Sequence, residues 1–253
     1  GAIIAEHELD LPERTLRTKA VWWTIPQSVL DEAEVVSGDL PGAVHAAEHA
    51  SIGLLPLFAG GGVRGLSVEE RTPSAWWWSD TERDPWYWRE QIAASGRAVY
   101  GKFFGGKAGF VSLDCFPRFA NVRRDGYDFD ALYEDGKASI RCKKIMDCFA
   151  LADELPSYEL KNLAGFGKGG ERNFEGTVAK LQQQAYLVIR AFRRRRNARG
   201  LEYGWPVAVY TPAERLVSPE LIAAAYREEP SESAQKLLGI LKKAAPGAPE
   251  SAL

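Results

Sequence analysis

The amino-acid sequence predicts an α+β fold, and the main reason is a change of hydrophobic periodicity between residues 135 and 212. Apolar residues first recur at the spacing of amphipathic helices in three successive segments. Strand-like segments then flank a run of four arginines. Three helices and a hairpin with a basic tip make a winged helix-turn-helix, which we expect over residues 135–212, after a mixed α/β region rich in aromatic residues. The expected helices span 137–151, 158–164 and 171–184, and the expected strands span 186–192 and 207–210.

Capping and turn signals set the limits of these helices. Ser157 is a residue type that caps helix N-termini, and Glu159 places negative charge in the following turn. Gly165 is expected to end that helix. In the third helix Phe174 and Leu181 lie on one face, which predicts the side that packs inward.

Charge is distributed unevenly along the chain. The 253 residues carry a formal net charge of −2, but residues 137–203 hold 14 Lys and Arg against 7 Asp and Glu, a local charge of +7. The rest of the chain therefore carries −9, because the total is −2. Such asymmetry between parts of one chain indicates contact with nucleic acid.

The segment 171–184 would be the second helix of the helix-turn-helix motif, whose solvent face contacts base edges in the major groove. Arginine and lysine suit phosphate or guanine, and asparagine and glutamine suit adenine. The loop before this helix lies near a helix N-terminus, which attracts phosphate, and the wing would follow the backbone or the minor groove. We expect nucleic acid as the partner, DNA rather than RNA. The expected binding residues are Lys168, Arg172, Asn173, Lys180, Gln183, Arg193, Arg194, Arg195, Arg196 and Arg199.

Two alternatives stay open for this segment. Winged helices also dock proteins, and a run of arginines is often only a solvated hairpin tip. Tyr203, Gly204 and Trp205 would then simply pack the wing down.

Residues 59–134 contain an aromatic cluster and a second hairpin. Residues 98–104 and 108–112 are predicted strands around a Gly-Gly-Lys turn. The glycine-rich stretch 60–65 lacks Gly-Lys-Ser/Thr, so a connector suits it better than a phosphate-binding loop. The aromatic residues either stack on unpaired bases or a sugar, or anchor a small core, and we favour the core. They are Trp76, Trp77, Trp78, Trp86, Tyr87 and Trp88.

An acidic cluster follows Arg123 and Arg124. Asp128 and Asp130 are carboxylates of the kind that hold a divalent cation. We favour the alternative, in which they cap the next element and pair with the two arginines.

Residues 1–58 are expected to form strands at 3–4 and 18–24 and a helix from Asp39 through Leu55. That helix contains His-Ala-Ala-Glu-His at 45–49, which fits the H-x-x-E-H string of inverted zinc peptidases. Two imidazoles one turn apart would hold zinc, with the carboxylate as general base. Because no third ligand stands out, we favour a packed histidine pair and expect neither a metal nor a cofactor.

Beyond the wing, residues 218–228 and 231–243 are predicted helices, each opened by a serine cap. They would provide the surface for self-association or for another partner, and the tail 245–253 is expected to be disordered. Three cysteines without C-x-x-C spacing favour a reducing compartment. No signal-peptide pattern and no bilayer-length apolar stretch occur, so we expect a cytoplasmic protein without membrane contact.

Several long and unusual strings stand out between residues 52 and 230. They are Leu-Leu-Pro-Leu-Phe at 54–58, Leu-Ser-Val-Glu-Glu-Arg-Thr at 66–72, Tyr-Gly-Lys-Phe-Phe at 100–104, Ala-Gly-Phe at 108–110, Arg-Arg-Asp-Gly-Tyr-Asp-Phe-Asp at 123–130, Gly-Phe-Gly-Lys at 165–168 and Tyr-Gly-Trp at 203–205. On these strings the segment resembles the bacterial AlkZ-related family. The resemblance implies similarity to winged-helix DNA glycosylases that unhook alkylated or crosslinked bases with a Gln-x-Gln or Gln-x-Asp motif. Here Gln182–Gln184 contains a Gln-x-Gln, but at the end of a recognition helix, so no catalytic role is carried over.

The first residues have a different resemblance. Lys-Ala-Val-Trp-Trp-Thr at 19–24 and His-Ala-Ala-Glu-His-Ala at 45–50 resemble part of the MrfA-like zinc-binding domain of DNA-repair helicases, without its zinc-binding cysteines. A fusion is therefore our hypothesis for this chain. The division that follows is a helicase C-terminal-like fragment (1–58), an aromatic-rich α+β region (59–134), the winged helix (135–212), C-terminal helices (213–244) and a tail (245–253).

The expected function is that of a nucleic-acid-binding winged-helix protein linked to DNA repair and not catalytic alone. A base-excision enzyme is the first alternative, and it requires Asp128, Asp130 or Gln184 to line a pocket. The second alternative is a protein-interaction scaffold that uses the two C-terminal helices.

Overall fold

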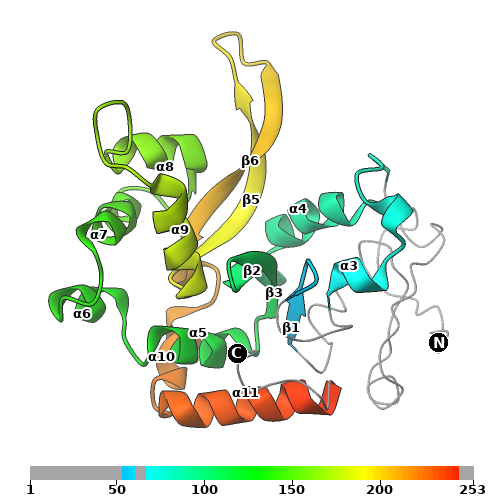
Figure 1. Cartoon of the computed structure of the whole chain (residues 1–253). Helices are drawn as coiled ribbons and strands as arrows, with labels where there is room; N and C mark the ends of the chain where they lie inside the picture. The colour runs from blue at the N-terminus through cyan, green and yellow to red at the C-terminus, as the bar shows by residue number, and fades with distance from the viewer. Residues whose placement is uncertain (1–52, 61–66, 82, 245–253) are drawn as a thin grey trace.

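The computed structural model describes residues 53–60, 67–81 and 83–244 (Figure 1). The expected strands at 3–4 and 18–24, the H-x-x-E-H string, the two strings that resemble a helicase domain, most of the glycine-rich stretch 60–65 and the C-terminal tail lie outside these residues. Within them, no helix has the length and apolar character needed to cross a membrane.

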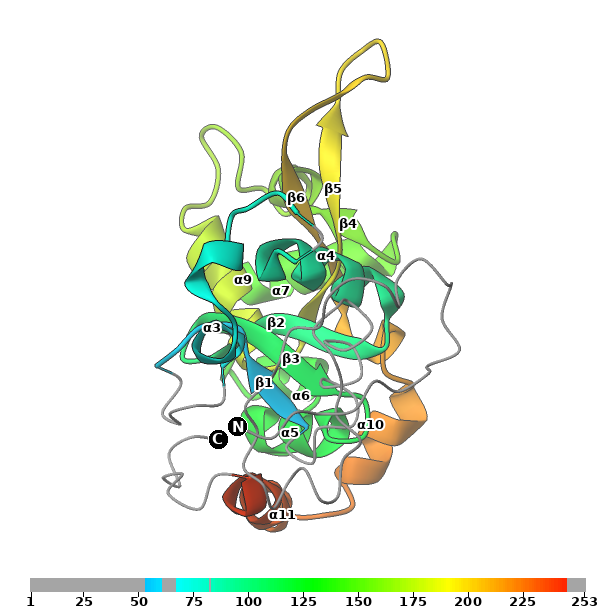
Figure 2. The same ribbon diagram turned by 90° about the vertical axis from the view of Figure 1, so that its right-hand side faces the viewer.

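One antiparallel sheet runs through the described chain, with six strands in the order β1-β3-β2-β5-β6-β4. Helices surround this sheet, so the fold is a mixed α+β fold, as the sequence predicts (Figures 1 and 2). The strands are β1 (Leu54–Pro56), β2 (Ala98–Phe104), β3 (Lys107–Ser112), β4 (Leu155–Pro156), β5 (Leu187–Arg196) and β6 (Glu202–Pro212).

The expected helix through Leu55 is wrong at its C-terminal end, because β1 begins at Leu54 and pairs with β3. Leu54, Leu55 and Leu57 are all buried, a pattern that suits a strand covered on both sides better than one face of a helix. The expected hairpin of β2 and β3 is confirmed. Gly105 and Gly106 form its turn with positive φ angles of 58° and 83°, which glycine adopts at little cost.

The described residues form two hydrophobic cores, and the larger lies around β1, β2 and β3. The helices that contribute to it are α3 (Val68–Arg71), α4 (Pro85–Ser95), α5 (Phe116–Arg124), α10 (Pro219–Ala225) and α11 (Pro230–Ala244), with 3-10 turns at Ser74–Trp76 and Ala213–Arg215. The expectation that the aromatic cluster anchors a core is confirmed for Trp88, which is buried, and for the half-buried Trp76, Trp77 and Trp86. Trp78 and Tyr87 are exposed instead.

The smaller core is formed by the helices that precede the long hairpin. Its elements are α6 (Phe129–Glu134), α7 (Ile140–Asp147), a 3-10 turn at Cys148–Ala150, α8 (Ser157–Leu163) and α9 (Phe174–Gln183), together with β4 and the start of β5. Ile145, Leu160 and Leu181 are fully buried in it, one from each of the three expected helices.

Several limits of the expected helices differ in the structure. The first helix, expected over 137–151, begins at Ile140 after its cap Ser139 and is followed by a 3-10 turn from Cys148. Ser157 is the first residue of α8 and its side chain makes no cap, because Pro156 occupies the N-cap position. The third helix begins at Phe174 rather than at residue 171, since Asn173 adopts a left-handed conformation with φ of 67°. The last helix begins at Pro230, so Ser231 lies inside it, whereas Ser218 caps α10 as expected.

The arginine run belongs to β5 and not to a loop. Arg193, Arg195 and Arg196 are paired with residues of β6, and only residues 197–201 form the tip. Consecutive arginines are compatible with an exposed two-stranded hairpin, because successive side chains point to opposite faces and both faces are in contact with water.

The acidic residues after α5 serve the fold. Asp128 accepts a hydrogen bond from the backbone N–H of Ala131 at 2.8 Å, which confirms it as the cap of α6. The expected pairing with Arg123 and Arg124 is wrong, because both guanidinium groups bond elsewhere. Among the described residues, no group of three His, Cys, Asp or Glu side chains is arranged to hold a metal ion.

The two C-terminal helices pack on α5 at the end of the molecule opposite the hairpin tip (Figure 1). Leu237 and Leu241 of α11 are buried in the larger core. Beneath them, Nδ2 of the fully buried Asn121 donates to the backbone oxygens of Ala225 and Glu228, at 3.1 and 3.0 Å. These helices therefore use their apolar faces within the chain, and self-association through them stays a prediction.

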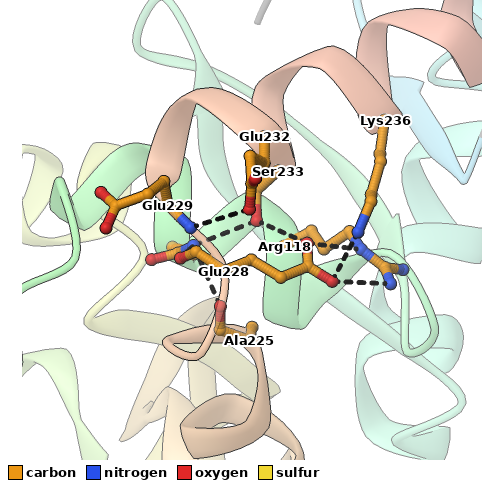
Figure 3. Close-up of polar contacts among 8 residues, drawn as sticks. Arg118, Ala225, Glu228, Glu229, Glu232, Ser233 and Lys236 are labelled. Carbon is orange, nitrogen blue, oxygen red and sulfur yellow. Dashed lines mark hydrogen bonds and ion pairs between the residues drawn. The ribbon is translucent and has the colours of Figure 1, made fainter.

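An ionic cluster fixes the turn between α10 and α11 (Figure 3). The carboxylate of Glu228 accepts from Arg118 of α5 at 3.2 Å and from Lys236 of α11 at 2.8 Å. Hydrogen bonds from these two cations lower the pKa of Glu228 to about 2. One side chain thus ties three helices together.

Candidate nucleic-acid interface

The hairpin of β5 and β6 extends beyond the rest of the protein in both views (Figures 1 and 2). We call the exposed part of this hairpin, residues 193–205, the wing. Arg193, Arg194, Arg195, Arg196 and Arg199 are all exposed on it. The structure therefore brings together the five expected arginines on one projecting element.

Two wing arginines are held by carboxylates. Arg193 pairs with Glu154, which lies just before β4, and Arg196 pairs with Glu202 across the hairpin at 3.3 Å. In the described part of the chain, Arg194, Arg195 and Arg199 form no ion pair with a carboxylate. The guanidinium of Arg195 lies over the ring of Tyr158 on α8, 5.0 Å from its centroid. The wing thus retains cations that its own acids do not neutralise.

Contacts with α4 hold the base of the hairpin. Arg190 donates to the backbone oxygens of Ala93 and Ala94 at the C-terminal end of α4, at 3.0 and 2.6 Å. The guanidinium of Arg89 lies between two rings, 3.5 Å from the centroid of Trp86 and 4.0 Å from that of Phe192. A base fixed in this way gives the wing a defined direction.

Helix α9 buries one side and exposes the other. Phe174, Val178 and Leu181 are buried, as expected, whereas Lys180 is exposed and Gln183 is half-buried near the β2–β3 turn. Arg172 and Asn173 are exposed but precede the helix rather than lie on it. Lys168 is exposed in the loop between α8 and α9.

Glu171 fixes that loop against α7. Its carboxylate accepts from Arg141 at 2.9 Å and from Lys144 at 2.8 Å. Hydrogen bonds from these two cations lower the pKa of Glu171. The residue next to Arg172 is thereby tied down, although the pairs are exposed and each contributes little to stability.

A cleft of about 510 Å³ adjoins α9 on the side toward α8 and the hairpin. Its cations are Lys102 of β2, Lys161 of α8 and Arg195, and Glu175 forms an ion pair with Lys161 at 3.4 Å. Burial raises the pKa of Tyr210 to about 12, so this phenol stays neutral. The remaining lining residues are Ser157, Tyr158, Asn162, Phe174, Val178, Gln182, Val207 and Ala208.

Sequence reasoning missed Lys102 and Lys161 as members of this surface. Lys102 lies on a different strand, and only the pairing of β2 with β5 brings it next to α9. Gln182 also lines the cleft, and it is almost fully buried. Its side-chain oxygen accepts from the backbone N–H of Lys102 at 3.1 Å, so it fastens α9 to β2. Asp128, Asp130 and Gln184, the residues expected to line a base-excision pocket, do not line this cleft.

Trp205 does not pack the wing down. Its side chain is 83% exposed, and Tyr203 is 49% exposed. Leu201 at the tip is also exposed. The alternative in which residues 203–205 cover the wing is therefore wrong for the tryptophan.

Comparison with known proteins gives one match. The family model described as AlkZ related matches residues 46–253. The chain therefore belongs to the AlkZ-related family. The match begins earlier and ends later than residues 52–230, the segment that contains the strings named above, and residues 1–45 lie outside it. No curated protein and no solved structure matches the chain.

Proposed function

From membership of the AlkZ-related family and the exposed cations of the wing, we propose that this protein binds duplex DNA through a winged helix formed by residues 135–212 and acts in DNA repair. In this proposal α9 enters the major groove and the wing follows the phosphate backbone beside it. The protein binds DNA without catalysing a reaction by itself.

The order of elements supports the winged helix. A helix (α7), a short strand (β4), two further helices (α8 and α9) and a long hairpin (β5 and β6) follow one another, and β4 pairs with β6. The three helices share one hydrophobic core. The side of α9 that faces away from this core carries Lys180.

The observation that carries the proposal is the wing itself. Five arginines are concentrated on this projecting hairpin, and among the described residues only Arg193 and Arg196 form an ion pair with a carboxylate, while Arg194 interacts with Glu90 at longer range. Phosphates would provide the missing negative charge, and release of the counterions bound to DNA favours that exchange.

Fluorescence anisotropy with a labelled duplex at about 50 mM salt tests the proposal. We expect binding by the unaltered protein and at least tenfold weaker binding by Lys180→Glu on α9 and by Arg195→Glu on the wing. Arg227→Glu is the matched control, because Arg227 is an exposed arginine next to α10, at the opposite end of the molecule. Equal affinity of all four proteins, or no binding by any of them, would refute the proposed interface.

A second candidate function, base excision, has one observation in its favour. The cleft beside α9, the proposed DNA-binding helix, contains an exposed carboxylate, Glu175. Excision would require the target base to leave the duplex and enter that cleft. Release of an alkylated base from treated DNA, lost in Glu175→Gln, would support it. Absence of release at high protein concentration would eliminate it.

A further inference from the structure

We propose that the wing contacts unpaired nucleotides, whose bases stack on Trp205 and Tyr203 while its arginines hold the adjoining phosphates. The inference rests on the proposed function and specifies its substrate: a duplex that contains an unpaired stretch, in preference to a fully paired one.

The exposure of the wing's apolar side chains is the first observation. A single exposed apolar residue is ordinary on a protein surface. Here, however, Leu201, Tyr203 and Trp205 are exposed within five consecutive residues, and Trp205 is exposed over 83% of its surface. An aromatic group of this size in water on a projecting hairpin indicates a surface that a partner covers.

The strand register places these rings beside positive charge. Tyr203 is directly paired with Arg195 across the hairpin. The register then shifts between Arg193 and Arg195, and Gly204, with a positive φ of 71°, lies within this irregular stretch. A bulge of this kind bends a strand and redirects the side chains next to it. Trp205, which follows Gly204, is thereby left unpaired and outside both hydrophobic cores.

The combination of rings and arginines identifies the chemistry of the partner. An aromatic side chain stacks on any base, but only where that base is not already stacked inside a duplex. The consecutive arginines of β5 can contact successive phosphates next to the stacked bases. Fully paired DNA would satisfy the arginines and leave Trp205 in water. A second copy of this chain would also cover the wing, and light scattering, described below, separates that outcome.

Fluorescence anisotropy with two labelled DNAs tests the preference. One is a fully paired duplex, and the other is the same duplex with a central gap in one strand that leaves about four nucleotides of the other strand unpaired. This length lies within the site size of proteins that bind single strands by stacking. The unaltered protein should bind the gapped DNA more tightly. Trp205→Ala and Tyr203→Ala should each reduce the affinity for gapped DNA at least about fivefold, the lower limit for loss of one base stack, and leave the affinity for paired duplex unchanged. Leu201→Ala and Leu151→Ala are the controls, because both leucines are exposed but cannot stack.

Tryptophan fluorescence gives an independent readout. The difference between the emission of the unaltered protein and that of Trp205→Phe isolates this side chain from the seven other tryptophans. Its signal should be readily quenched by acrylamide in the free protein and protected when gapped DNA is added. A Trp205 signal already protected in the free protein would overturn the proposal, since the ring would then be covered within the protein.

The outcomes distinguish this inference from the proposed function. Binding to both DNAs with equal affinity, unaffected by Trp205→Ala, refutes the inference and leaves duplex binding intact. No binding to either DNA refutes both. A change of oligomeric state in Trp205→Ala, measured by light scattering and without any change in DNA affinity, assigns the wing to protein contact and also overturns the inference.

Discussion

The salt dependence of DNA binding should report how many wing arginines contact phosphate. Arg194, Arg195 and Arg199 form no ion pair within 4.0 Å among the described residues, although Arg194 lies close enough to Glu90 to interact with its charge. We expect one phosphate contact from each of these three arginines. Each contact to B-DNA changes the slope of log affinity against log salt by about −0.9, so the three together contribute about −2.7. On this account alone, the affinity for DNA should be roughly 500-fold higher at about 0.1 M salt than at about 1 M salt.

The triple substitution Arg194→Gln/Arg195→Gln/Arg199→Gln keeps polar side chains and removes the charges. Titrations at several salt concentrations should show a slope shallower by about 2.7, and each single substitution should account for about 0.9 of it. Lys137→Gln/Arg227→Gln is the control, because these exposed cations lie next to α6 and α10, away from the wing. An unaltered slope in the triple variant, or an equal loss in the control, would show that the wing makes no phosphate contact.

Three further predictions follow from the ion pairs and the buried network. Glu202→Gln removes the carboxylate that pairs with Arg196 and should raise DNA affinity several-fold at low salt. The control Glu220→Gln on α10 should leave the affinity unchanged. Weaker DNA binding by Glu202→Gln would contradict a role for Arg196. The pKa of Glu228 is lowered from 4.5 to about 2, so its ion pairs stabilise the fold above about pH 4.5 and lose this effect as the pH falls toward 2. The difference in urea midpoint between the unaltered protein and Glu228→Gln should therefore shrink over that pH range. Arg124→Ala should lower the free energy of unfolding, measured by urea denaturation, by about 3 kcal/mol. A loss below about 1 kcal/mol would show that the buried hydrogen bonds of Arg124 do not stabilise the fold.

The magnitude for Arg124 comes from its surroundings. Its side chain is buried and donates to the phenol oxygen of Tyr226 at 2.8 Å and to the backbone oxygen of Ala185 at 2.7 Å, besides its ion pair with Glu214. Its guanidinium also lies over the ring of Tyr186, 4.5 Å from the centroid. Truncation leaves buried oxygens without donors, and each such group costs about 1–3 kcal/mol.

Local patterns in the sequence predict the three helices and the long hairpin of residues 135–212, but not the short strand β4. Helical spacing identified α7, α8 and α9, because each of them buries one stripe of side chains in the same small core. Gly165 was identified as a helix stop, and it has a positive φ of 77° after α8, as a helix-ending glycine often does. Strand ends were less predictable: the arginine run suggested a loop, yet cross-strand pairing with β6 extends β5 to Arg196.

Other features depend on contacts between distant residues, which spacing along the chain does not reveal. The arginines at 123–124 precede acidic residues, and local pairing was the natural expectation. Instead Arg124 reaches Glu214, 90 residues away, because α10 and the preceding turn fold back onto α5. The cleft beside α9 is similar, since Lys102 comes from a hairpin of the other core. The wing arginines, by contrast, could be predicted to lie together, because they are close in sequence; their role in binding stays a prediction.

The shared sheet has a consequence for the proposed winged helix. Strand β5 belongs to both cores: Leu187 is buried in the smaller one, and Val188 and Ile189 are buried in the larger one. Tyr210 on β6 packs against both. The hairpin of the proposed winged helix is therefore packed against the larger core as well as against its own helices. The direction of the wing relative to α9 therefore depends on β2 and α4 as well as on the three helices. Substitution of Arg89, which contacts the base of the hairpin, should alter DNA affinity even though this residue is not part of the proposed DNA interface.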